Sequence, residues 1–180
     1  MNKEVFLKLS LISKGVIAIC ALVGFLMEMF LHGWHSIRYY TNQSNLLVVI
    51  FLIYLLLKYR KEGHWSQWDI RLKGGMTVAI LLTGLVYHFM LAPLKTPEEF
   101  WTIENFLVHY IVPYGALLDW ALFDKGHCYK WWDPFVWTIL PLAYEIISVA
   151  IALITRIPIG NNPDRSEERR VGKECSEPCR

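Results

Sequence analysis

Two side chains, Thr41 and His109, have the chemistry of a nucleophile and its base, and each lies beside a long apolar run. A hydroxyl group attacks a carbonyl efficiently when a nearby base accepts its proton, and histidine is the usual base. His88 is a second candidate for that base. The side-chain amides of Asn45 and Asn105 could stabilise the oxyanion that such an attack produces. These residue types therefore indicate acyl transfer as one chemistry open to the chain.

The segments that carry these residues are predicted to be transmembrane helices. A helix that spans a bilayer needs about 20 mostly apolar residues. Five segments fit, at residues 11–31, 44–57 (extended to 60 by long side chains that reach the interface), 74–92, 102–123 and 134–155. Hydrophobic residues make up 54% of the chain and charged residues 19%, against about 45–50% and about 25% in soluble domains. The sequence therefore predicts an all-α fold, a polytopic transmembrane helix bundle, and excludes a soluble globular domain.

Basic residues predict the orientation of this bundle, because cytoplasmic loops are enriched in Lys and Arg. If the N-terminus is cytoplasmic, Arg38, Lys95 and Arg156 face outward. The cytoplasmic side then carries Lys3, Lys8, Lys14, Lys58, Arg60, Lys61, Arg71, Lys73, Lys125 and Lys130. We therefore expect an integral, multi-pass protein of a bacterial inner membrane with a cytoplasmic N-terminus. The formal net charge of +2 argues against a nucleic-acid partner.

Polar side chains inside a membrane are costly and indicate functional sites. In the predicted orientation, four helices place such side chains at a similar depth in the outer leaflet: Glu28, Thr41, Asn45, His88, Asn105 and His109. With a rise of ~1.5 Å per residue, His109 lies about 10 Å below the outer start of the fourth helix. We predict that Thr41 and His109 are catalytic, and that Asn45, His88, Asn105 and Glu28 support the site or bind substrate.

Simpler interpretations are open for the same residues. Thr41 is a good N-cap for the second helix, and His88 and His109 could form hydrogen bonds between helices. Asp119 and Asp124 fit charges at the membrane interface. The spacing of these residues in the sequence does not show whether any of them are in contact.

Two other classes of function are compatible with the sequence. The ionisable residues Glu28, His88, His109 and Glu145 lie within helices and would suit a small proton-linked carrier, although no inverted repeat accompanies them. A non-catalytic lipid-binding protein is the second alternative. The sequence has no phosphate-binding loop and no zinc motif, so we expect neither a metal nor an organic cofactor.

The composition changes abruptly after Asp164. Residues 165–175, RSEERRVGKEC, resemble the conceptual translation of a common sequencing adapter. We therefore interpret residues 1–164 as the transmembrane domain and residues 165–180 as a non-native tail. Five spans are then what a six-helix bundle without its last helix would show.

Several short strings resemble the androgen-induced protein family. They are YYTNQSN at residues 39–45, GLVYH at 84–88, NFLVHYIVP at 105–113, LDW at 118–120 and PLAY at 141–144. The similarity spans roughly residues 24–160, and the strings occur in the order that the family shows. The chain is thus similar to uncharacterised bacterial relatives of that family.

This resemblance implies a six-helix membrane fold and a threonine hydrolase. Animal members of the family cleave fatty acid esters of hydroxy fatty acids, so the implied partner is a membrane lipid or fatty-acid ester substrate. The nucleophilic threonine of the family falls on Thr41 and its essential histidine on His109. The implied mechanism is acyl transfer without a metal or an organic cofactor. This chain departs from the family in lacking a sixth apolar helix.

Overall fold

The computed structural model describes residues 2–124 and 128–155, and within this part every regular element is helical. The chain divides into two compact units, Met1–Pro141 and Leu142–Arg180. The described part of the second unit is a stretch of one helix, α8 (Ile139–Thr155), which also carries Glu145. The predicted tail at residues 165–180 lies outside the described residues.

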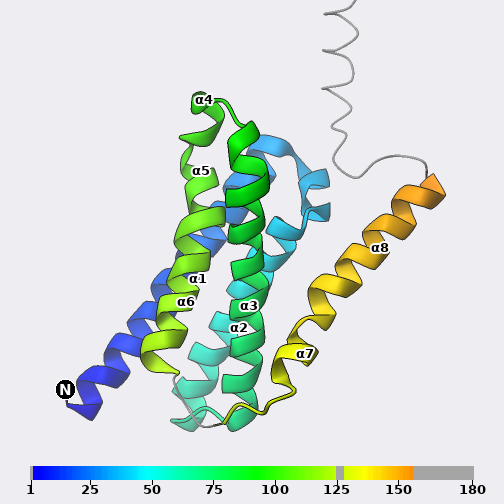
Figure 1. Cartoon of the computed structure of the whole chain (residues 1–180). Coiled ribbons are helices and arrows are strands. Elements are labelled where there is room, and N and C mark those ends of the chain that lie inside the picture. The colour runs from blue at the N-terminus through cyan, green and yellow to red at the C-terminus, as the bar shows by residue number, and fades with distance from the viewer. Residues whose placement is uncertain (1, 125–127, 156–180) are drawn as a thin grey trace, which may run out of the picture. The chain divides into compact units, whose positions relative to one another are not determined.

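Four long helical rods form the first unit. They are α1 (Lys3–His32), α2 (Tyr40–Glu62), α3 (Gln67–Val86) with its extension η2 (Tyr87–Leu91), and the continuous rod of α5 (Ile103–Phe106), η4 (Leu107–Ile111) and α6 (Val112–Phe123). Neighbouring rods pack in the cyclic order α1, α2, α3, α6, and α2 also contacts the fourth rod at η4 (Figure 1). Short elements connect them: η1 (Trp34–Arg38), η3 (Ala92–Leu94) and α4 (Pro97–Phe100). A further short helix, α7 (Asp133–Trp137), follows the fourth rod.

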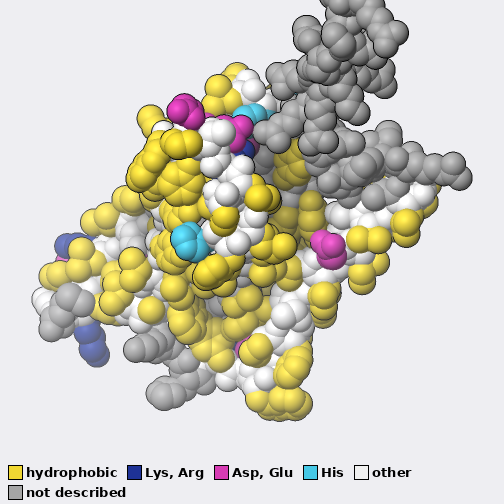
Figure 2. All heavy atoms as spheres, turned by 45° about the horizontal axis from the view of Figure 1, so that its top comes forward, with side chains coloured by type: hydrophobic (Ala, Val, Ile, Leu, Met, Phe, Trp, Pro, Cys, Tyr) yellow, Lys and Arg dark blue, Asp and Glu magenta, His cyan; other side chains and the backbone are white. Residues whose placement is uncertain are grey.

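Five helical stretches are long and apolar enough to cross a membrane: Lys3–His32, Tyr40–Glu62, Gln67–Leu94, Ile103–Phe123 and Asp133–Ile151. They overlap the five predicted spans, so the predicted all-α, multi-pass membrane fold is confirmed. Among the described side chains on the face that Figure 2 draws, hydrophobic ones predominate, as expected for helices that contact lipid.

The helices extend beyond the apolar segments that predicted them. α3 begins at Gln67 because Ser66 and Asp69 form a capping box, in which each side chain binds the other residue's backbone N–H. α2 ends at Glu62, and the cap residue after it is Gly63, whose φ of 72° is left-handed and favours glycine. Hydropathy locates the span, whereas these local hydrogen bonds set the ends of the helix.

The apolar core lies between the four rods. Its buried residues come from all of them: Ile17, Ala18, Ala21, Val48, Val49, Leu52, Leu55, Met76, Ile80, Val112 and Ala116. Packing rather than hydrophobic exclusion of water holds helices together in lipid. The small side chains of α1 and α6 in this set are consistent with close approach of those helices.

Two π-helical turns interrupt the rods near the end of the unit that carries α4, called here the α4 end (Figure 1). In η4 the N–H of Val112 bonds the carbonyl of Leu107, five residues earlier. The next residue, Pro113, has no N–H, so the carbonyl of Val108 loses its partner in this register. The same pattern occurs where η2 precedes Pro93. The two prolines thus coincide with a change of helical register, a common feature of functional sites.

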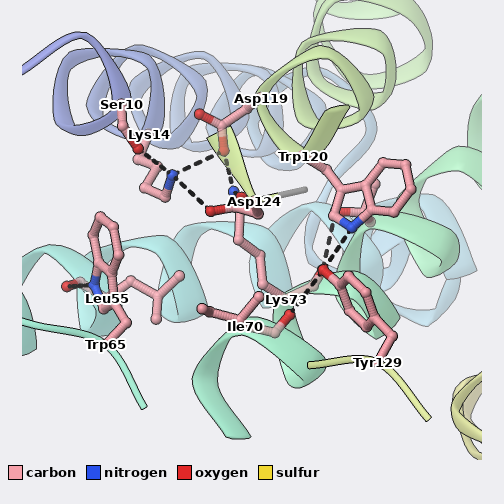
Figure 3. Close-up of polar contacts among 11 residues, drawn as sticks. Ser10, Lys14, Leu55, Trp65, Ile70, Lys73, Asp119, Trp120, Asp124 and Tyr129 are labelled. Carbon is pink, nitrogen blue, oxygen red and sulfur yellow. Dashed lines mark hydrogen bonds and ion pairs between the residues drawn. The ribbon is translucent and has the colours of Figure 1, made fainter. Parts of the chain in front are cut away.

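Charged side chains are buried towards the opposite end of the unit, and we call these four residues the ionic cluster: Lys14, Lys73, Asp119 and Asp124 (Figure 3). Lys73 bonds both aspartates. Lys14 lies 3.2 Å from Asp119 and 3.5 Å from Asp124. Asp119 is 1% exposed and Asp124 is 6% exposed. These two aspartates, which the sequence suggested as charges at the membrane interface, thus point inward onto lysines from α1 and α3.

Candidate active site

Thr41 and His109 come together at the α4 end of the bundle. Thr41 lies in the first turn of α2, and His109 is the middle residue of the π-helical turn η4. The Thr41 Oγ1 atom is 3.4 Å from the His109 Nε2 atom. Bonds between a nucleophile and its base are often this long in ligand-free enzymes. The two residues are 68 positions apart in the sequence, so helix packing creates this contact.

Thr41 is not the N-cap of α2. That position belongs to Tyr39, which makes no side-chain capping hydrogen bond. The backbone carbonyl of Thr41 is fixed by Ser44 Oγ, at 3.0 Å, and by Asn45 Nδ2, at 2.8 Å. The Thr41 side chain is half-buried. Its hydroxyl faces the imidazole, and the residue as a whole is partly exposed.

His109 is 8% exposed and is held on its second nitrogen by Asn105. The His109 Nδ1 atom lies 3.0 Å from the Asn105 Oδ1 atom and 3.2 Å from the Asn105 backbone oxygen. The Asn105 Nδ2 atom donates to the backbone oxygen of Phe100 at 2.9 Å. Asn105 thus orients the imidazole from one helical turn before it.

Tyr87 completes the surroundings of the imidazole. Its ring stacks on the His109 ring with centroids 3.8 Å apart and an interplanar angle of 20°. Tyr87 is 2% exposed and is the first residue of the other π-helical turn, η2. Sequence reasoning missed this residue, although it directly precedes His88 in the GLVYH string. No spacing in the sequence marks it, because its contact with His109 joins two different helical rods.

Asn45 joins α2 to the turn that carries His109. Its Nδ2 atom donates to the backbone oxygen of Thr41 and, at 3.4 Å, to that of Val108. Val108 is the residue whose carbonyl Pro113 leaves without a helical partner. Both contacts of the Asn45 amide NH₂ group are to backbone oxygens. Asn45 therefore connects α2 to the His109 turn and does not act as an oxyanion donor in this arrangement.

Glu28 and His88 lie at the same end of the bundle but bond other residues. The Glu28 carboxylate is 4.0 Å from His32, one turn further along α1. His88 is exposed and its Nδ1 atom is 3.2 Å from the hydroxyl of Tyr110. Of the six predicted site residues, the structure thus joins Thr41, Asn45, Asn105 and His109 in one hydrogen-bonded group.

Two glycines allow the neighbouring helices to approach η4 closely. A Cβ atom on Gly84 of α3 would lie 2.9 Å from the His109 backbone oxygen, and one on Gly24 of α1 would lie 2.8 Å from a Val108 methyl group. Such distances are shorter than ordinary carbon contacts. The absence of a side chain at these positions therefore lets α1 and α3 pack closely against the turn that carries His109.

A hollow of about 490 Å³ lies elsewhere, along α2, and is lined by Ile50, Ile53, Tyr54, Leu57, Lys58, Lys61 and Glu62. None of these residues belongs to the Thr41–His109 group, and all come from one helix. We therefore take the chemistry of the side chains, rather than this hollow, as the indicator of the site.

The arrangement can activate a hydroxyl, because a base faces it and a third group orients the base. Within residues 2–124 and 128–155, no group of three His, Cys, Asp or Glu side chains is placed to hold a metal ion. Comparisons of the chain with protein-family models, with curated proteins and with solved structures gave no match.

Proposed function

We propose that this protein is a membrane-embedded lipid-ester hydrolase with Thr41 as nucleophile and His109 as general base. The 3.4 Å contact between Thr41 Oγ1 and His109 Nε2 is the observation that carries the proposal. The resemblance of the strings around both residues to the androgen-induced protein family supports the same assignment. On this basis we infer membership of that family.

The reaction would proceed in two acyl transfers. His109 accepts the Thr41 hydroxyl proton as Oγ1 attacks the ester carbonyl, and the alcohol leaves with the proton that His109 returns. Water then attacks the acyl-threonine, again with His109 as base. This step releases the fatty acid and restores the Thr41 hydroxyl.

The proposed substrate is an ester of a fatty acid with a hydroxy fatty acid. Large apolar side chains are exposed at the same end of the bundle, among them Phe89 (71%), Met90 (65%) and Trp101 (72%). Such side chains suit contact with acyl chains, so an ester could reach Thr41 laterally from the bilayer. With the N-terminus in the cytoplasm of a bacterium, the site would lie in the outer leaflet of the inner membrane.

A fluorophosphonate probe tests this proposal directly. The probe is added to the membrane-expressed full chain, and mass spectrometry locates the phosphonyl adduct after purification in detergent. We expect an adduct on Thr41 that disappears in both Thr41→Ala and His109→Ala, whereas Thr41→Ser keeps a hydroxyl and retains labelling.

Two matched variants control for folding. Thr77 is a buried threonine that bonds a backbone oxygen of its own helix, and His64 is an exposed histidine in the loop after α2. Thr77→Ala and His64→Ala should label like the unaltered chain. A correctly folded chain that gains no adduct on Thr41 would overturn the hydrolase proposal and favour lipid binding or transport.

A further inference from the structure

The orientation of the Asn105 side-chain amide follows from its two contacts. One amide atom faces the backbone oxygen of Phe100 at 2.9 Å, and a carbonyl oxygen can only accept a hydrogen bond. That amide atom must therefore be the NH₂ group. The other atom, Oδ1, is then the acceptor that faces His109 Nδ1 at 3.0 Å.

The tautomer of His109 follows in turn. Its Nδ1 atom faces two acceptors, Asn105 Oδ1 and the Asn105 backbone oxygen at 3.2 Å. A neutral imidazole carries one hydrogen, and here the hydrogen must be on Nδ1 to satisfy these oxygens. The lone pair of Nε2 is then left to face Thr41 Oγ1, which is the arrangement that a base requires.

The orientation of the His109 imidazole ring is also fixed. Tyr87 covers one face of the imidazole at 3.8 Å between centroids. Rotation of the ring about its Cβ–Cγ bond would break both the stacking and the Asn105 bonds. Burial of His109 and Tyr87 further excludes water from competing for Nδ1.

We propose that Asn105 is a positioning residue, which holds His109 in the Nδ1–H tautomer and so completes an Asn105–His109–Thr41 hydrogen-bonded triad. The catalytic role of this triad rests on the proposed hydrolase function, whereas the assignment of the tautomer does not. An amide orients the imidazole without adding a charge. A carboxylate in its place would have to be desolvated in the membrane, which costs considerably more.

The first measurement needs no variant at Asn105. The full chain is labelled with ¹⁵N-histidine in detergent micelles, and the His109 signals are assigned as those that vanish in His109→Gln. We expect the spectrum to show the hydrogen on Nδ1 at a pH where the ring is neutral. A hydrogen on Nε2 would overturn the proposal.

Two variants test the role of the side chain. Asn105→Leu removes Oδ1 and should populate the Nε2–H tautomer and slow fluorophosphonate labelling of Thr41 by at least about 10-fold. We expect less than the ~10⁴-fold loss that a wrong tautomer causes in serine proteases, because the backbone oxygen of residue 105 remains as an acceptor. Asn105→Asp restores a side-chain acceptor and should label faster than Asn105→Leu.

The outcomes separate this inference from the proposed function. If folded Asn105→Leu keeps both the Nδ1–H tautomer and the labelling rate, Asn105 does not position His109. If the tautomer changes as expected but the unaltered chain is never labelled, Asn105 positions His109 and the hydrolase assignment fails.

Discussion

The same four-helix unit buries two polar groups that differ in charge. The Thr41–His109–Asn105 group at the α4 end consists of side chains without a permanent charge, and its central contact is long, at 3.4 Å. The ionic cluster consists of two lysines and two aspartates that contact one another directly. The first group leaves Thr41 half-buried and accessible, whereas the members of the second face each other.

Because of this difference in charge, we expect the ionic cluster to affect the stability of the fold and the Thr41–His109–Asn105 group to affect reactivity. The ionic cluster joins α1, α3 and α6, and removal of one partner leaves an uncompensated charge in an apolar interior. The neutral group can lose a hydroxyl or an imidazole without leaving a charge unpaired. We therefore expect substitutions in the ionic cluster to affect folding first, and substitutions at Thr41 or His109 to affect labelling first.

The largest effect is predicted for Asp119→Ala. Among the residues that the structure describes, this change leaves Lys14 and Lys73 with Asp124 as their only carboxylate. It should lower the free energy of unfolding by about 3–5 kcal/mol. Titration with a denaturing detergent, followed by circular dichroism, measures the loss. The charge-balanced double variant Lys73→Met with Asp119→Leu should be more stable than Asp119→Ala. Equal stability of Asp119→Ala and the unaltered chain would remove the distinction between the two polar groups.

A smaller effect on stability, together with an effect on chemistry, is predicted for Gly84→Ala. The new Cβ atom would meet the His109 backbone oxygen at 2.9 Å and Pro113 at 3.1 Å. We expect a loss of about 1–3 kcal/mol from overpacking and slower labelling of Thr41, because the His109 turn must shift.

Gly15→Ala is the matched control, since a Cβ atom there has no neighbour within 4 Å. It should stabilise α1 slightly, by up to about 1 kcal/mol, and leave labelling unchanged. If both glycine variants behave alike, close packing of α3 against η4 does not position His109.

The smallest effect is predicted for His88→Ala. The imidazole of His88 is exposed and bonds Tyr110 rather than Thr41, so stability should change by no more than about 0.5 kcal/mol. Labelling of Thr41 should proceed as in the unaltered chain. Abolished labelling in folded His88→Ala, with His109→Ala still reactive, would transfer the role of base to His88.

Much of the fold could be predicted from the sequence because hydropathy is a local property. All five apolar segments are helices, and their approximate limits follow from apolar length alone. The ends were less predictable. α3 starts at Gln67 rather than near residue 74, because the Ser66–Asp69 capping box continues the helix into polar sequence.

The direction in which each polar side chain points was harder to predict. Asp119 sits on a helix end where an interfacial charge is usual, yet it faces Lys14 and Lys73 inside the bundle. The side on which a residue lies depends on how its helix is rotated against its neighbours. That rotation results from packing over the whole unit and has no signature in a single segment.

The sequence by itself determined the element type, the membrane setting and the residue types available for acyl transfer, because apolar length and side-chain chemistry are read locally. Only the tertiary structure decided that Thr41 meets His109 and that Asn105 and Tyr87 hold the imidazole. It also decided that His88 bonds Tyr110 instead. The physical reason is that these contacts join residues of different helices, so they depend on how the helices pack and are rotated against one another.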